Sequence, residues 1–209
     1  SVRKTFAYPI KKKKMKQADL ESMVENQLTT TTALDDLKDV DLIIEAVLED
    51  MTVKQDIWKK LEGICRPDAI FATNTSALPI SEMASILDDP GRMIGLHFFN
   101  PAHRMMLLEI ICAAKTSDQT LASSVSFARA IKKIPIVVND GPGFYVSRQL
   151  GGLFGAATFL SADGVDGAVI EKAMLEFGMP MGPATLSDLT GIDINYHVNK
   201  TLEKRLGER

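Results

Sequence analysis

Short apolar segments alternate with segments of helical periodicity between residues 40 and 138, and this alternation constrains the fold more than any other feature. The first apolar segment, VDLIIEAV at residues 40–47, is rich in β-branched residues and typical of a strand buried on both faces. In the segment after it, Val53, Ile57 and Leu61 recur at helical spacing. Strands that alternate with helices predict a mostly parallel sheet covered on both faces.

Four more strand-like segments continue the pattern. They are AIFAT, RMIGLHFF, MMLLEIICA and IPIVV. Helices are expected at ISEMASIL and at SDQTLASSVSFARAIKK, which opens with a Ser/Asp capping signal. Upstream of the first strand, KQADLESMVENQ predicts a short polar helix.

The pattern changes near residues 140–143, where NDGPGF has the composition of a turn. Beyond it the sequence predicts helices at 144–160, 166–177 and 193–206, with FGMPMGP as a break between the last two. The segment GGLFG lies in the first of these helices and indicates close helix packing. We therefore expect an α/β domain over residues 1–140 and a smaller all-α domain over residues 141–209.

Charge and cysteine content narrow the class of protein. The 209 residues carry a formal net charge of −3 and contain no run of 18 apolar residues, so we expect no membrane span. Cys65 and Cys112 lack metal-ligand spacing and are expected to be core thiols in a reducing compartment. The first 18 residues hold seven basic side chains and no acidic one. This stretch could meet a phosphate-bearing ligand or nucleic acid, remain from a targeting segment, or form a solvated helix face.

Polar residues follow three of the predicted strands. In open parallel sheets, ligands collect at the carboxyl ends of the strands, so we expect these side chains to face one crevice. The residues concerned are Glu45, Glu49, Asn74, Ser76, His97 and Asn100.

His97 and Glu109 form the candidate catalytic pair. Histidine titrates near neutral pH and needs a partner to fix its tautomer. Glu109 lies within the next apolar strand, where a carboxylate is costly to bury unless it is paired. A carboxylate-oriented histidine is a competent base for an alcohol proton, and a purely structural pair is the alternative. His103 and His197 show no metal-site spacing, so both are expected to be structural or solvated, and no metal site is predicted.

Five segments resemble the L-3-hydroxyacyl-CoA dehydrogenase family. They are DVDLIIEAVLED, IFATNTSALPI, GLHFFNPAHRMMLLEII, DGPGFYVSR and FGMPMGPATLSDLTGID, in the order and spacing of that family. The chain is most similar to the dehydrogenase part of multifunctional β-oxidation proteins of the trifunctional-protein alpha-subunit type. The resemblance implies a doubly wound, Rossmann-type sheet and the oxidation of a 3-hydroxyacyl-CoA to the 3-ketoacyl-CoA with NAD.

The resemblance also implies roles for single residues. His97 matches the catalytic histidine, Glu109 the glutamate that pairs with it, and Ser76 a serine that touches substrate and cofactor. Ser147 stands near the substrate, where the family often has an asparagine. The other implied contacts are Glu49, Lys54, Asn74 and Asn100 with the cofactor, and the lysine run that includes Lys12 and Lys13 with CoA.

The G-x-G-x-x-G turn that precedes these segments in the family is absent from the sequence. That turn holds the dinucleotide pyrophosphate, so we expect an incomplete doubly wound sheet, truncated at its amino terminus, and impaired activity. One alternative is a catalytically silent module retained for assembly. Another is a dehydrogenase for a free hydroxy acid, which would leave the basic stretch without a ligand.

The resemblance extends to partners and compartment. It implies a homodimer or a larger β-oxidation complex assembled through the helical domain, with no nucleic acid partner. The mitochondrial matrix is the expected compartment, ahead of the peroxisome and the bacterial cytoplasm.

Overall fold

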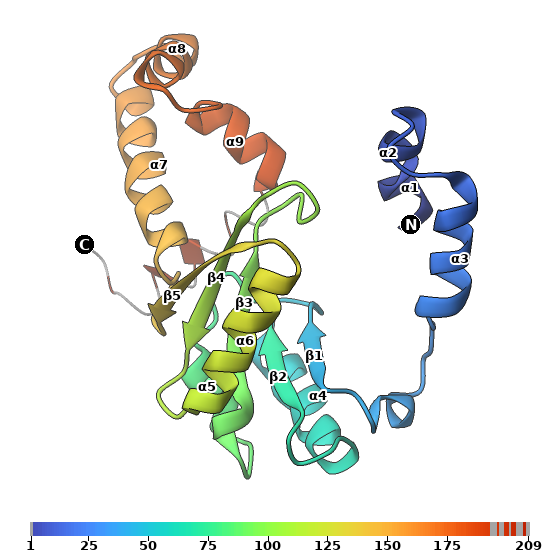
Figure 1. The fold of residues 1–209 in the computed structure, drawn as a ribbon. Helices are drawn as coiled ribbons and strands as arrows, with labels where there is room; N and C mark the ends of the chain where they lie inside the picture. The colour runs from blue at the N-terminus through green and yellow to red at the C-terminus, as the bar shows by residue number, and fades with distance from the viewer. Residues whose placement is uncertain (1, 193–195, 197–198, 201, 204–206, 208–209) are drawn as a thin grey trace.

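A five-stranded sheet organises the chain as far as residue 139 (Figure 1). This computed structural model describes residues 2–192, 196, 199–200, 202–203 and 207. The strands are β1 (Leu42–Glu45), β2 (Ile70–Thr73), β3 (Met93–Phe98), β4 (Leu107–Cys112) and β5 (Ile134–Asn139). They lie in the order β1-β2-β3-β4-β5, and every neighbouring pair is parallel except β3 with β4. The expected α/β class with a mostly parallel sheet is confirmed.

The antiparallel pair arises from the short segment between β3 and β4. Residues 99–106 are too few for the helical crossover that a parallel connection requires, so the chain turns back directly. The resulting register places His97 opposite Glu109. Directly opposite residues point to the same face of a sheet, so this register brings the two side chains together.

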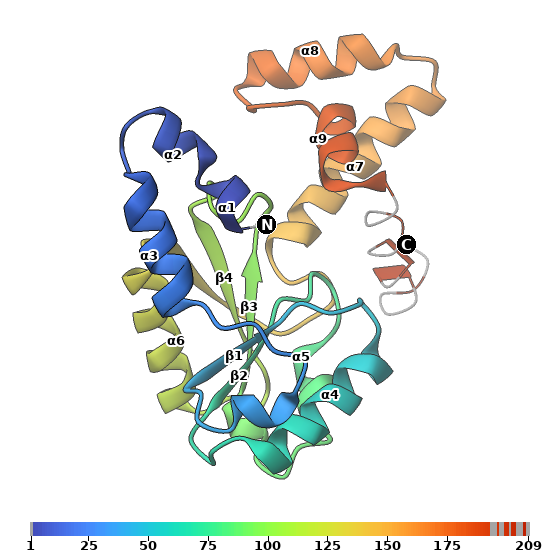
Figure 2. The same ribbon diagram turned by 90° about the vertical axis from the view of Figure 1, so that its right-hand side faces the viewer.

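Helices cover both faces of the sheet (Figure 2). α4 (Met51–Ile64) and α5 (Ile80–Ala84) lie on one face, and α6 (Asp118–Ala130) lies on the other. On the α4 side, the Trp58 ring stacks on Phe71 with 5.0 Å between the ring centroids. On the α6 side, Ala128 packs with strand residues such as Ile94. Two apolar cores therefore sandwich the sheet.

The two edge strands are less buried than the central ones. Ile44 on β1 is 39% exposed and Val137 on β5 is 52% exposed. The prediction that residues 40–47 are buried on both faces is therefore wrong. β1 is the edge of the described sheet, and an edge strand leaves part of its surface to solvent.

The amino-terminal helices stand away from the sheet on the side of β1 (Figure 1). They are α1 (Val2–Thr5), α2 (Ala7–Lys11) and α3 (Gln17–Gln27), and a 3-10 helix, η1 (Leu34–Leu37), leads from them to β1. α3 confirms the helix expected from KQADLESMVENQ. A second 3-10 helix, η2 (Pro90–Arg92), leads into β3.

Three helices follow the sheet: α7 (Val146–Ala162), α8 (Gly167–Phe177) and α9 (Pro183–Thr190). α7 and α8 were expected, but the sequence pattern missed α9. The sequence does carry a signal for the start of this helix. Pro183 occupies the first turn of α9, where its missing N–H costs nothing. The helix predicted at 193–206 lies largely outside the described residues, as does His197.

The expected role of GGLFG is wrong for this chain. A Cβ atom added at Gly151, Gly152 or Gly155 would meet no described atom within 4 Å. These glycines therefore do not mark a close helix contact within the described structure. Among the residues that the structure describes, no helix is long and apolar enough to cross a membrane.

We predict that Gly95→Ala destabilises the sheet. A Cβ at this β3 position would lie 2.8 Å from Cδ1 of Ile111 and 3.2 Å from Cδ1 of Ile80. Overpacking of this kind should lower the free energy of unfolding by about 1–3 kcal/mol, measured by urea denaturation. The control is Gly63→Ala in α4, where a Cβ meets nothing within 4 Å. That change should raise stability by about 0.5–1 kcal/mol through helix propensity, and equal losses in both variants would contradict the packing explanation.

Candidate active site

A buried histidine and carboxylate form the centre of the site. Nδ1 of His97 lies 2.6 Å from Oε2 of Glu109, and the two residues are 6% and 0% exposed. A carboxylate only accepts hydrogen bonds, so Nδ1 is the donor of this bond. In the neutral imidazole, Nε2 is then the acceptor. The His97 ring also packs against Phe99 and Phe144, with ring centroids 4.5 and 6.0 Å away.

The other oxygen of Glu109 binds the start of α7. Oε1 accepts hydrogen bonds from the backbone N–H groups of Tyr145, at 3.2 Å, and Val146, at 2.9 Å. These donors belong to the amino-terminal end of a 17-residue helix, where the helix dipole favours a negative charge. Glu109 therefore has partners at both oxygens, which makes its complete burial tolerable.

The loop after β2 lies beside the histidine. Oδ1 of Asn74 accepts the backbone N–H of Phe98 at 2.9 Å, so this side chain ties the loop to the end of β3. Oε1 of Glu49 accepts the hydroxyl of Thr75 at 2.5 Å and the backbone N–H of Ser76 at 3.0 Å. These bonds hold the loop that carries Ser76.

A buried ion cluster supports Glu49. Nζ of Lys54 lies 2.6 Å from Oε1 of Glu45 and 3.3 Å from Oε2 of Glu49, and the lysine side chain is 1% exposed. Oε2 of Glu45 also accepts the hydroxyl of Thr73 at 2.7 Å. Glu45 was recognised in the sequence only as a residue at a strand end. Its role as the buried partner of Lys54 depends on α4 packing back over β1.

A cavity of about 520 Å³ opens beside His97. Ser76, Asn100 and Ser147 also line it, so the structure brings together four of the predicted site residues. The hydroxyl of Ser147 on α7 lies 3.5 Å from the carbonyl oxygen of Ser76, at the junction of the sheet and the helical part.

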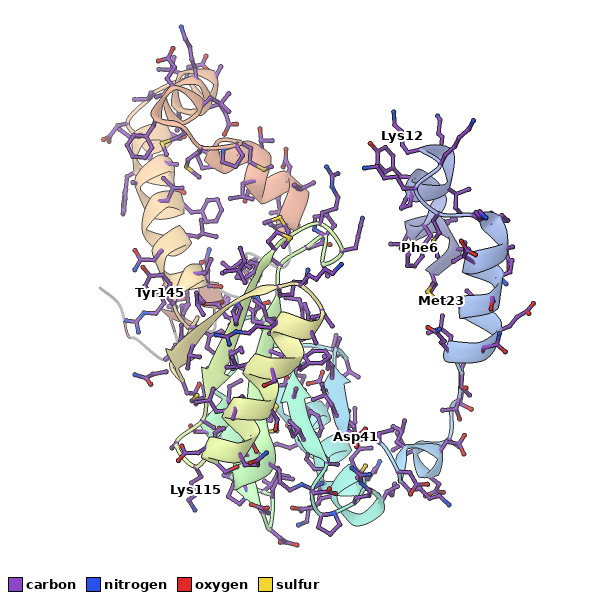
Figure 3. All side chains as sticks on the ribbon, in the orientation of Figure 1. Phe6, Lys12, Met23, Asp41, Lys115 and Tyr145 are labelled. Carbon is purple, nitrogen blue, oxygen red and sulfur yellow. The ribbon has the colours of Figure 1, made fainter. Side chains whose placement is uncertain are left out.

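The other predicted site residues lie outside the cavity lining. Lys54 pairs with Glu49, Glu49 accepts the backbone N–H of Ser76, and Asn74 accepts the backbone N–H of Phe98. Lys12 and Lys13 are exposed residues at the end of α2, and Figure 3 shows Lys12 far from Tyr145 at the start of α7. His103 is exposed, as expected.

Two family descriptions match the chain. Residues 1–141 match "3-hydroxyacyl-CoA dehydrogenase, NAD binding domain", and residues 143–209 match "3-hydroxyacyl-CoA dehydrogenase, C-terminal domain". The chain is also 43% identical over 208 residues to a "Fatty acid oxidation complex subunit alpha" from Shewanella sp. (strain W3-18-1). That match covers 98% of the chain and 30% of the relative, so the chain spans about 30% of the length of such curated relatives.

Solved structures show the same fold. The (S)-3-hydroxybutyryl-CoA dehydrogenase PaaH1 from Ralstonia eutropha is 34% identical with a TM-score of 0.92, over 99% of this chain and 73% of that one. The dehydrogenase part of multifunctional enzyme 1 from C. elegans is 33% identical with a TM-score of 0.64, over 99% of this chain and 47% of that one. With the family matched along both parts of the fold, the chain belongs to the 3-hydroxyacyl-CoA dehydrogenase family.

Proposed function

We propose that the chain oxidises an L-3-hydroxyacyl-CoA to the 3-ketoacyl-CoA in fatty acid β-oxidation, with NAD as cofactor. The observation that carries the proposal is the 2.6 Å contact between His97 and Glu109 at a cavity also lined by Ser76. Family membership supports the same reaction class.

His97 acts as the general base in this proposal. Nε2 accepts the proton of the substrate hydroxyl, because Nδ1 is already committed to Glu109. The imidazolium that forms is stabilised by the carboxylate of Glu109, which the α7 backbone holds in place. Phe99 and Phe144 pack around the ring and limit the access of water to it.

Two hydroxyl groups orient the substrate. The side chains of Ser76 and Ser147 reach the cavity from the sheet and from α7, so both can bind the oxygen atoms near the reacting carbon. A phosphate-bearing CoA portion could extend toward the basic residues Lys12 and Lys13. Those lysines lie on the amino-terminal helices, away from the cavity lining.

The residues present fit the nicotinamide portion of NAD. Ser76 and Asn100 supply a hydroxyl and an amide beside His97, and the side chain of Glu49 is 33% exposed at the carboxyl end of β1. Such groups suit a ribose and a carboxamide. Bound NAD supplies the acceptor for the hydride that leaves the substrate. Lys54 is buried against Glu45 and Glu49, so it supports the cofactor through Glu49.

Assembly through the helical part is also a proposal. Phe159, Phe177 and Ile192 are 74%, 83% and 67% exposed, so the helical part presents large apolar side chains that a protein partner would cover. The relatives from Shewanella are named as subunits of a fatty acid oxidation complex. The mitochondrial matrix stays a prediction, and those relatives come from bacteria.

We predict that His97→Ala lowers kcat by about 10²- to 10⁴-fold in the full-length natural protein, because the general base is lost. NADH formation from 3-hydroxybutyryl-CoA measures the rate, and NADH fluorescence checks that dinucleotide binding is retained. His103→Ala is the control, since that histidine is exposed and outside the cavity lining. Unchanged turnover in His97→Ala would remove the base assignment, and no turnover in the unmodified protein would favour the silent module.

Two substitutions of Glu109 should separate catalysis from architecture. Both Glu109→Gln and Glu109→Ala remove the charge beside His97. Each should lower kcat about tenfold or more, because the general base loses the partner that stabilises its protonated form. Gln keeps an oxygen for the α7 N–H groups, whereas Ala leaves them unpaired. Ala should therefore be less stable than Gln by about 2–3 kcal/mol in chemical denaturation. Wild-type kcat in the Gln variant would make the pair purely structural.

A further inference from the structure

The cavity beside His97 continues along one face of α7. Helix residues that line it recur at intervals of three or four, which places them on a single face. Between Ser147 and Ser161 the helix rises by about 21 Å. The α7 lining includes Ser147, Leu150, Gly151, Phe154, Ala157 and Ser161.

The character of the lining changes along this face. The inner end carries the polar side chains of His97, Ser76 and Ser147. Beyond them the lining has large apolar side chains, namely Phe154, Ile170 of α8 and Leu186 of α9. Smaller polar side chains, such as Thr158 and Ser161 of α7, also line this part. A ligand with a polar reacting group and an apolar extension would match this order.

Gly151 leaves the apolar part of the lining open. It lies on the same face as Leu150 and Phe154, and a Cβ at this position would meet, among the described residues, no atom outside the backbone of its own helix within 4 Å. The segment that was expected to mark helix packing therefore provides free space next to the catalytic end of the cavity. A longer side chain at residue 151 would occupy that space.

We propose that this face of α7 receives the acyl tail of the substrate and that Gly151 is a specificity-determining residue for chain length. The inference rests on the proposed dehydrogenase function. From Ser147 to Ala157 the helix rises by about 15 Å, much more than a four-carbon acyl group can span. Medium-chain substrates therefore gain contacts in this cavity that a 3-hydroxybutyryl group does not make.

The outer end of the cavity limits the tail. Oε1 of Glu171 accepts the backbone N–H of Ala184 at 2.7 Å, and Oε2 accepts the hydroxyl of Thr185 at 2.7 Å. The Thr185 hydroxyl, with the backbone N–H groups at the start of α9, lowers the pKa of the Glu171 carboxyl. Glu171 is thus ionised at neutral pH, and an apolar tail would not profit from reaching it.

The test compares kcat/KM for 3-hydroxydecanoyl-CoA and 3-hydroxybutyryl-CoA in the full-length natural protein. Gly151→Leu should lower the C10-to-C4 ratio about tenfold or more, because each methylene transferred from water strengthens binding about fourfold. Gly151→Ala should give a smaller decrease in the same direction. It also guards against misfolding of the Leu variant, because alanine is a better helix former than glycine.

Gly152→Leu is the matched control. Gly152 is the next residue of the same helix, is exposed and lies outside the cavity lining. Its substitution should leave the ratio unchanged. An unchanged ratio in both Gly151 variants, an equal decrease in Gly152→Leu, or a wild-type preference for the C4 substrate would overturn the inference. Turnover of 3-hydroxybutyryl-CoA by the unmodified protein tests the proposed function separately.

Discussion

The rest of the site depends on the hydrogen bonds of the Glu109 carboxylate. One oxygen binds Nδ1 of His97, and the other accepts the first backbone N–H groups of α7. A fully buried charge is tolerated only when its partners are in place, so the histidine and the helix are positioned together. The same contact joins the sheet to the helical part, which brings Ser147 near Ser76.

A second buried network fixes the other wall of the site. Lys54 neutralises Glu45 and Glu49, and Glu49 in turn holds the backbone of Ser76. Burying the charges of Lys54 and Glu45 is favourable only if each is paired and hydrogen-bonded, as these are. The network therefore does more to fix the position of the loop that carries Ser76 than to raise the net stability of the fold. Residues implied as cofactor contacts by resemblance can thus have a second, architectural role.

Family membership and local geometry are two separate kinds of support for the proposed reaction. The family matches cover both parts of the fold, whereas the curated relatives are much longer than this chain. The pairing of His97 with Glu109 is a property of the described residues themselves. The apolar face of α7 adds a feature that neither the motifs nor the family descriptions contain, because it depends on where three helices place their side chains.

The sequence alone determined the alternating strands and helices, the turn near residue 140 and the pairing of His97 with Glu109. These follow from hydrophobic periodicity, turn composition and motif, which are local properties. The sequence patterns did not predict α9. They wrongly predicted that β1 is buried on both faces and that the glycines of α7 mark close helix packing. Only the tertiary structure decided that β3 and β4 are antiparallel, that Glu109 also binds α7, and that Gly151 faces a cavity. The physical reason is that register, buried charge partners and open space arise from contacts between segments distant in the chain, which a local pattern does not encode.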